Sequence, residues 1–279
     1  MRQELKFDTA FSQIAIPEWE PKPRGSGITM VIDWGIGLNE QTDVIGTSGY
    51  FIDIAKIAVG MSRLIPREYL AKKIGLYKQN DIQPFPGGQW LELAILQNRV
   101  SEYFEAASAI GYEYVEVSDN AIAISPNRKK QIIQQAIESG LEVIGEVGKK
   151  VSTTDVDALV SDVENTLEGG AWKVFVEAKE IFGEELNRDI IQKLANSLDI
   201  SKLIFEIPGA YVQPVHNYEQ YEMWRWLLNC FGPKVNIASI LPGDSLKLAA
   251  LRLGVGPDTD YEPGAFCRSV SGELSKHQS

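Results

Sequence analysis

Short apolar runs alternate along the chain with longer segments that have the apolar period of a helix. A run such as ITMVID is rich in β-branched residues, which is typical of a strand. A segment such as NRKKQIIQQAIESG has apolar residues three or four positions apart and ends in glycine, which predicts an amphipathic helix. Eight strands are predicted in this way, over residues 28–33, 51–57, 82–85, 114–118, 141–147, 173–178, 203–207 and 235–240.

The predicted strands recur with a period of about 30 residues, which is the length of one strand, one loop and one helix in a βαβ unit. The strand-end markers used for this spacing are Asp33, Lys56, Phe85, Val117, Glu146, Glu177, Glu206 and Ile237. Near-continuous apolar strands also suit a parallel sheet covered by helices. We therefore predict an α/β fold, a single (β/α)₈ TIM barrel. An open doubly wound sheet shares this local pattern, but no G-x-G-x-x-G follows the first predicted strand.

The barrel is expected to occupy residues 28–259. Proline and glycine are frequent before it, so residues 1–27 are predicted to form an irregular amino-terminal arm. Residues 260–279 follow the last βα unit and are predicted to be a carboxyl-terminal tail.

Composition narrows the possible partners. The net charge of -11 over 279 residues argues against nucleic-acid or anionic-membrane surfaces, because both need basic patches. Cys230 and Cys267 are far apart and predict neither a disulfide framework nor a zinc site. No apolar leader or membrane-length apolar run occurs, so we expect a cytoplasmic protein. We also expect a homo-oligomer with a small anionic substrate.

Acidic residues stand at or near the carboxyl ends of five predicted strands, namely Asp33, Glu116, Glu146, Glu177 and Glu206. The carboxyl ends of barrel strands meet at one face, where active sites form, so these side chains are expected to converge. Crowded carboxylates repel one another unless a cation or shared protons neutralise them. A Mg²⁺ ion, which prefers oxygen ligands, is the simplest such cation. The alternative is that individual carboxylates form helix caps or structural ion pairs.

Three lysines are candidates for chemistry. Lys56 lies within the apolar run FIDIAKI, where an unpaired ammonium group is unfavourable, so we predict that it faces the cavity and pairs with a carboxylate or an anionic substrate. A lysine at the strand tip with its ammonium in solvent is the alternative. Lys149 and Lys150 follow Glu146 in the fifth β-to-α loop, where a lysine can bind anions or deliver a proton. An exposed lysine pair is the competing interpretation.

Two loops are also informative. Gly87 and Gly88 open a helix in FPGGQWLE, and their backbone N–H groups are candidates to bind a carboxylate or phosphate, although Pro-Gly-Gly is also an ordinary turn. Residues 211–226 are rich in aromatic side chains and suit a lid, a subunit contact or core packing. The chain contains no G-x-S-x-G, Walker loop or HExxH motif, so nothing favours a hydrolase, NTPase or zincin of those types.

A set of segments resembles the phosphosulfolactate synthase family. The matching segments, in order, are GITMVIDWGIG, YFIDIAKIAVGMS, FPGGQWLELA, GYEYVEVSDNAIAI, GLEVIGEVGKK, KVFVEAKE, KLIFEIP, FGPKVNIASI and LRLGVGPDT. The resemblance implies a (β/α)₈ barrel lyase that needs Mg²⁺ and adds sulfite to phosphoenolpyruvate. The product in that family is 2-phospho-3-sulfolactate, an intermediate of coenzyme M biosynthesis or of sulfolactate formation.

The resemblance and the acidic strand ends together predict residue roles. The predicted catalytic residues are Lys150, Glu146 and Lys56, the first two being tied to proton transfer. The predicted metal ligands are Asp33, Glu116, Glu177 and Glu206. The predicted substrate-binding residues are Gly87, Gly88, Ser118, Lys149, Lys179 and Trp34.

Several positions depart from the family pattern, so the chain is predicted to be a divergent member. Trp34 replaces a polar or basic residue, Lys179 replaces an arginine, and Ala210 and Gly256 replace cationic or polar groups. Each charge-assisted hydrogen bond lost removes about 1.5–3 kcal/mol. We therefore expect sulfite and phosphoenolpyruvate to be poor substrates and another small acid to be preferred. The alternatives are a family member with a different acceptor or nucleophile, or a non-catalytic stress-related barrel like some plant relatives.

Overall fold

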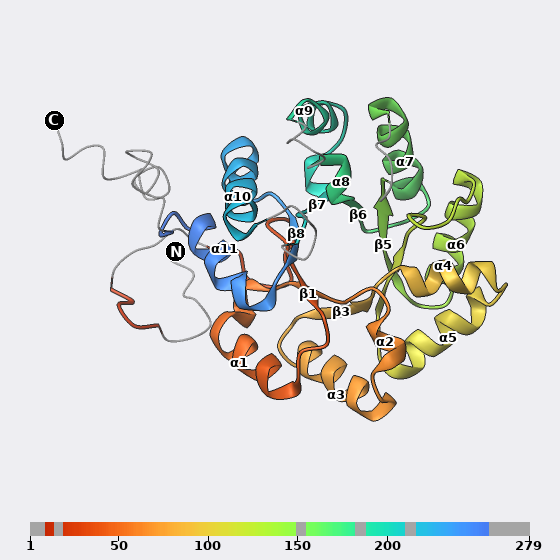
Figure 1. Ribbon diagram of the computed structural model, residues 1–279, viewed down its shortest axis with the longest axis horizontal. Coiled ribbons are helices and arrows are strands. Elements are labelled where there is room, and N and C mark those ends of the chain that lie inside the picture. Colours follow the sequence, from red (N-terminus) through yellow and green to blue (C-terminus); the bar gives the residue numbers. More distant parts are fainter. Residues whose placement is uncertain (1–8, 14–18, 149–154, 182–187, 210–215, 257–279) are drawn as a thin grey trace.

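The computed structural model describes residues 9–13, 19–148, 155–181, 188–209 and 216–256 (Figure 1). Within them, eight parallel strands form one sheet that rolls into a nearly closed barrel. The strands are β1 (Thr29–Asp33), β2 (Ile54–Ile57), β3 (Gln83–Pro86), β4 (Tyr114–Val117), β5 (Glu142–Val147), β6 (Lys173–Val176), β7 (Leu203–Glu206) and β8 (Ile237–Ile240). Their order in the sheet is β3-β2-β1-β8-β7-β6-β5-β4, which confirms the predicted (β/α)₈ barrel.

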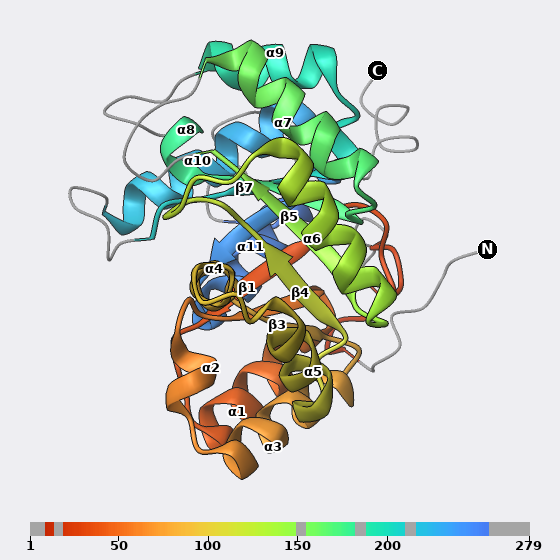
Figure 2. The same cartoon turned by 90° about the vertical axis from the view of Figure 1, so that its right-hand side faces the viewer.

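Helices surround the strands, as both views of the ribbon show (Figures 1 and 2). They are α1 (Leu38–Ser48), α2 (Met61–Leu64), α3 (Arg67–Lys78), α4 (Gln89–Leu96), α5 (Val100–Ile110), α6 (Pro126–Glu138), α7 (Val156–Glu168), α8 (Ala178–Ile181), α9 (Arg188–Ser197), α10 (Asn217–Phe231) and α11 (Ser245–Arg252). Short 3₁₀ turns lie at Gly49–Phe51, Ile200–Lys202 and Pro242–Asp244. No helix among the described residues is long and apolar enough to cross a membrane.

The eight predicted strands all occur, with some boundaries shifted. The second strand begins at Ile54 rather than at residue 51, because Gly49–Phe51 forms a 3₁₀ turn before it. Ile237 was predicted to mark the carboxyl end of the last strand. It is instead the first residue of β8, so this marker was wrong. The apolar run, and not the exact end, is what the sequence predicts reliably.

The barrel has a seam between β3 and β4, where no strand ladder is formed among the described residues. The backbone N–H of Gln83 donates to Asp53, directly before β2, at 2.9 Å, and that of Gly87 donates to Ile57 of β2 at 3.2 Å. Since successive N–H groups of a strand point in opposite directions, those that would face β4 belong to Pro84 and Pro86. Proline has no N–H, so β3 has no donor to offer on that side.

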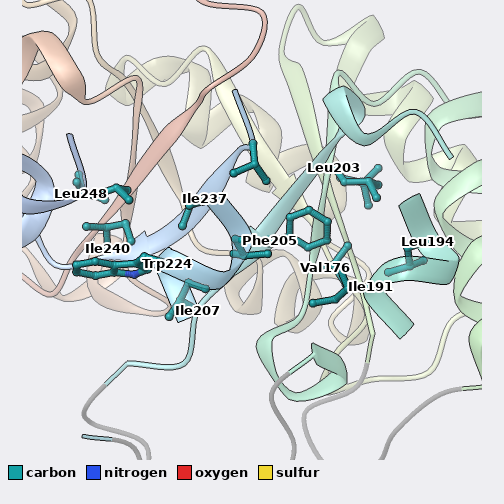
Figure 3. Close-up of a cluster of buried hydrophobic side chains, with 14 of the residues drawn as sticks. Val176, Ile191, Leu194, Leu203, Phe205, Ile207, Trp224, Ile237, Ile240 and Leu248 are labelled. Carbon is teal, nitrogen blue, oxygen red and sulfur yellow. The ribbon is translucent and has the colours of Figure 1, made fainter. Parts of the chain in front are cut away.

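Apolar side chains fill two separate regions. The barrel interior contains Ile28, Met30, Ile54, Phe85, Ile144, Phe175, Ile204 and Ala238. The other side chains of the strands pack against the helices, and Figure 3 shows part of this outer core, including Phe205, Ile237, Ile240 and Trp224. Inside the barrel, the rings of Phe85 and Phe175 stack with centroids 5.8 Å apart.

The described end of the amino-terminal arm packs against the amino ends of the strands. Arg24 forms a buried ion pair of 2.8 Å with Asp53, the residue before β2. Lys173, the first residue of β6, donates to the backbone oxygen of Gly25 at 2.7 Å. Residues 9–13 and 19–27, the described part of the arm, contain no helix or strand. The arm therefore covers the end of the barrel opposite to the carboxyl ends of the strands.

Candidate active site

A charged layer follows the apolar interior toward the carboxyl ends of the strands. Ile54 and Ile204 belong to the interior cluster, and the residue two positions after each of them is charged. Because side chains alternate along a strand, that residue also faces the interior. The layer contains Lys56, Glu116, Glu146 and Glu206, each of them buried.

Lys56 has a carboxylate on either side. Its Nζ lies 2.8 Å from Glu116 Oε2 and 3.3 Å from Glu206 Oε1, and 5.2 Å from the centre of the Phe175 ring. Burial alone would lower the pKa of Lys56, but Glu116, Glu206 and Glu146 together raise that pKa well above its ordinary value. Lys56 is therefore a buried, charged ammonium group, as its place in an apolar run suggested. Its catalytic role stays a prediction.

The surroundings of Glu116 favour its protonated form. Burial raises the pKa of Glu116 well above its ordinary value, the Lys56 ammonium opposes this, and the neighbouring Glu146 carboxylate adds to the rise. The backbone N–H of Gly88 donates to Glu116 Oε1 at 3.0 Å. Protonation of Glu116 would reduce the repulsion between the adjacent carboxylates.

Glu146, Glu177 and Glu206 form a carboxylate trio, with one oxygen of each within 4.8 Å of the others. Mg²⁺ prefers oxygen ligands, carboxylates among them, at about 2.1 Å. The convergence of three carboxylates and their all-oxygen donor set therefore suit Mg²⁺. Two members, Glu177 and Glu206, are predicted metal ligands, and the third was predicted to be catalytic. Glu116, also a predicted ligand, pairs with Lys56, and its role as a ligand stays a prediction.

Asp33 is not brought into this cluster. Its Oδ2 accepts from Tyr77 at 2.9 Å and lies 2.8 Å from Lys73 Nζ, both of which are on α3 outside the barrel. Its Oδ1 accepts two backbone N–H groups of the loop after β1, at 2.8 and 3.0 Å. Four donors thus bind a completely buried carboxylate on the helical side of the strand. These contacts match the structural ion pair that was the alternative for single acidic strand ends.

The glycine loop is explained by close packing. A Cβ at Gly87 would lie 2.6 Å from Val59 Cα, and one at Gly88 would lie 2.3 Å from Ser118 Oγ. The N–H of Gly88 is directed to Glu116. The loop thus bridges the seam between β3 and β4, and its predicted role in substrate binding stays a prediction.

The other predicted substrate-binding residues are distributed unevenly. The side chain of Trp34 is 37% exposed directly after β1. Ser118 is buried after β4. Lys149 and Lys150 lie outside the described residues, and Lys179 lies in α8, where its side chain is outside the described part of the structure.

Sequence reasoning missed Glu92, a buried residue of α4. Its carboxylate accepts from the Ser118 hydroxyl. It also accepts from the backbone N–H groups of residues 120–122, at 2.8 to 3.1 Å. The same loop carries Asn120, whose Nδ2 donates to Glu177 Oε2 at 3.4 Å. Glu92 therefore fixes the loop that contacts one member of the carboxylate trio. An acidic residue within the apolar helix QWLELAIL was the available signal.

Lys129 on α6 was also missed. Its Nζ donates to Asp119 at 3.0 Å, to the backbone oxygen of Glu146 at 2.8 Å and to Asp162 at 3.3 Å. It thereby joins the loop after β4, the end of β5 and helix α7. The signal was its position, because Lys129 shares the buried face of α6 with Ile132.

The fold and this layer define a class of protein. A (β/α)₈ barrel that buries a charged lysine, a carboxyl group with a raised pKa and an oxygen-rich trio at the carboxyl ends of its strands is a barrel enzyme. Residues 17–258 match the family of (2R)-phospho-3-sulfolactate synthase, and the chain belongs to this family of lyase-type enzymes.

Individual relatives agree with this assignment. The chain is 32% identical over 255 residues to phosphosulfolactate synthase of Methanothermobacter thermautotrophicus, with 87% of this chain and 95% of the relative covered. It is 21% identical over 247 residues to the Arabidopsis thaliana protein named heat-stress-associated 32, with 77% and 82% covered. The solved structure of 3-hexulose-6-phosphate synthase superposes with a TM-score of 0.51 at 10% identity, covering 81% of this chain and 99% of that one, which shows the fold alone.

Proposed function

We propose that this chain catalyses a Mg²⁺-dependent addition of sulfite, or a related nucleophile, to phosphoenolpyruvate or a similar small unsaturated acid. The observation that carries the proposal is the buried layer in which charged Lys56 meets the trio of Glu146, Glu177 and Glu206. Membership of the phosphosulfolactate synthase family supports the same reaction type.

The trio would hold the Mg²⁺ ion through carboxylate oxygens of Glu146, Glu177 and Glu206. When bound, the ion supplies positive charge that stabilises the negative charge developing on the acceptor's carboxylate. The buried surroundings strengthen that interaction, because the effective dielectric is lower there than in water.

The proposed reaction forms a bond between the nucleophile's sulfur and C3 of the acceptor. The π bond between C2 and C3 breaks, its electron pair moves toward the acceptor's carboxylate, and C2 then takes a proton. The raised pKa of Lys56 favours its charged form, which would attract the anionic groups of the acceptor. Proton delivery to C2 is assigned to Glu146 and Lys150 from the sequence, with Lys150 outside the described residues.

A second candidate is the same type of addition to an acceptor that carries an apolar group. The observation that favours it is Trp34, whose side chain is 37% exposed at the end of β1. An indole there suits a hydrophobic substituent better than a phosphate. Trp34→Lys is expected to raise kcat/KM for phosphoenolpyruvate and to lower it for the apolar acceptor.

The test is a steady-state assay of the full chain with Mg²⁺, sulfite and phosphoenolpyruvate, with the product identified by mass spectrometry. We expect the sulfonated product, and we expect Glu146→Gln to lower kcat at least 100-fold because it removes one acid–base and ligand group. The matched control is Glu142→Gln, an exposed position at the other end of the same strand, which should leave kcat unchanged.

The outcomes separate the candidates. A kcat/KM of about 10⁴ M⁻¹s⁻¹ or more supports phosphoenolpyruvate as the acceptor. A much lower value, with faster turnover of another small unsaturated acid, supports the second candidate. Undiminished turnover in excess chelator would contradict the Mg²⁺ requirement.

A further inference from the structure

Between two aligned pairs of residues, strand β8 contains one residue more than its neighbour β1. Thr29 of β1 is aligned with Ile237, and Val31, two positions later, is aligned with Ile240, three positions later. The extra residue is a β-bulge, which bends a strand and changes the direction of its side chains. On its other side β8 aligns regularly with β7, where Glu206 is opposite Ala238.

The bulge turns two successive side chains into the barrel. Ile237 and Ile240 both belong to the outer core beneath the helices (Figure 3), and Ala238 belongs to the interior cluster. Strict alternation would give Ser239 the same direction as Ile237. Instead, the Ser239 hydroxyl donates to Glu206 Oε1 inside the barrel, at 3.3 Å.

The backbone at Ser239 is in an unfavourable conformation. Its φ of 63° is in the left-handed region, which side-chain-bearing residues rarely adopt. Asp81 and Asn98 also have positive φ, but they are exposed and of the types that tolerate it best. Ser239 is 6% exposed and lies within a strand, so surrounding contacts hold it in this conformation. Such strain is concentrated at functional sites.

Glu206 receives two contacts at the same oxygen. Lys56 Nζ and the Ser239 hydroxyl both lie 3.3 Å from its Oε1. Two donors from different strands fix the rotation of the carboxylate plane, which a single ion pair leaves adjustable. This rotation decides how Glu206 meets the other two members of the trio.

We propose that Ser239 is a positioning residue and that the bulge in β8 serves to aim the Ser239 hydroxyl at Glu206. The inference rests on the proposed function, in which Glu206 is one of the carboxylates that hold Mg²⁺. Hydrogen-bond partners of metal-binding side chains orient those side chains, and their loss typically weakens metal binding by 10–100-fold.

The experiment compares Ser239→Ala with Ser239→Gly in the full chain. Both variants remove the hydroxyl, but only glycine relieves the left-handed backbone. We expect both to weaken Mg²⁺ binding about 10-fold in calorimetry without substrate. We expect Ser239→Gly alone to raise the melting temperature of the metal-free protein, by about 2–4 °C. A higher stability with weaker Mg²⁺ binding is a combination that a purely structural serine would not produce.

Asn98→Gly is the matched control, because it relieves a positive φ in an exposed turn far along the chain from the trio. It should leave Mg²⁺ binding unchanged. If the wild type binds Mg²⁺ and both Ser239 variants bind it equally well, the inference is overturned while the proposed function stands. If the wild type binds no Mg²⁺, the proposed function fails and the inference fails with it.

Discussion

At Lys56, one ammonium group lies within ion-pairing distance of two buried carboxyl groups. Burying a charge is unfavourable unless partners compensate for the lost hydration. Here Glu116 and Glu206 compensate for Lys56, and Lys56 in turn compensates for them. The three residues therefore depend on one another, and the loss of one leaves buried charge on the others.

We expect Lys56→Met to reduce the free energy of unfolding by about 3–5 kcal/mol at pH 8, because it leaves Glu116 and Glu206 without their cation. Without Lys56, burial keeps the pKa of Glu116 above its ordinary value of 4.5. The folded state then binds more protons than the unfolded state, so stability falls as pH rises from about 5 to 8. Urea unfolding at several pH values measures this loss, which should be smallest near pH 5.

Lys247→Met is the control for this prediction. Lys247 pairs with Asp244 at an exposed site, and such pairs contribute about 0–1 kcal/mol. A loss at Lys56 as small as that at Lys247, or one independent of pH, would contradict the mutual compensation described above.

The sequence predicted the environment of Lys56 but not that of Asp33. An unpaired ammonium group is unfavourable in an apolar strand, so the sequence alone predicts that the Lys56 side chain points toward carboxylates. Asp33 is the last residue of its strand, and the alternation of side chains gives it the helical side. Its partners Lys73 and Tyr77 lie about 40 residues later, and no local pattern pairs them with it.

Among the elements, helix α6 carries two adjacent lysines with different surroundings. Lys129 is buried and contacts two acidic side chains and the end of β5, whereas Lys130 forms an exposed pair with Glu168. The helix begins at Pro126 after the cap Ser125, which fixes which face is buried. Two lysines adjacent in sequence therefore differ in role, because Lys129 is a buried structural cation and Lys130 is a surface cation.

We expect Lys129→Met to lower the free energy of unfolding by about 3–5 kcal/mol, because it removes the cation bound to buried Asp119. Lys130→Met should change it by at most about 1 kcal/mol, since the pair with Glu168 is exposed. Chemical denaturation of both variants checks the contrast. Equal effects would show that α6 is not held to the barrel through Lys129.

The sequence was most informative about which helices and strands form. Each strand has its own apolar run, so its existence does not depend on distant contacts. The bulge in β8 was not predicted, although the spacing of apolar residues in VNIASI indicates it. The outward-facing residues Val235 and Ile237 are two positions apart, whereas Ile240 follows Ile237 by three positions. A single break in alternation is too weak a signal to interpret without the neighbouring strand, which is why Ser239 was overlooked.

At the scale of the whole molecule, the seam between β3 and β4 is the place where strand hydrogen bonding stops. Pro84 and Pro86 provide no donors there. The backbone oxygen of Glu113 accepts from Glu142 of β5, so Glu113 faces β5. Because backbone groups alternate in direction along a strand, the N–H groups of Tyr114 and Glu116 face the seam. The side chains of Glu92 and Glu116 bind loops across it instead. The sheet therefore has two edges, both in the middle of the sequence.

We expect the amide hydrogens of Tyr114 and Glu116 to exchange with solvent at least 10-fold faster than that of Phe175 in β6, which has strands on both sides. Hydrogen exchange followed by NMR or mass spectrometry measures this difference. Equal protection at these three amides would show that the seam opens no more readily than the rest of the sheet.

The position of β1 has a consequence for how the protein is made. β1 pairs with β2 and with β8, whose residues are among the last of the barrel to leave the ribosome. At synthesis rates of roughly 5–20 residues per second, the nascent chain carries β1 for roughly 10–40 seconds before β8 exists. During that interval one edge of a strand whose five residues are all buried in the finished barrel is unpaired and open to other nascent chains, so the chain is most prone to association before translation reaches Ile240.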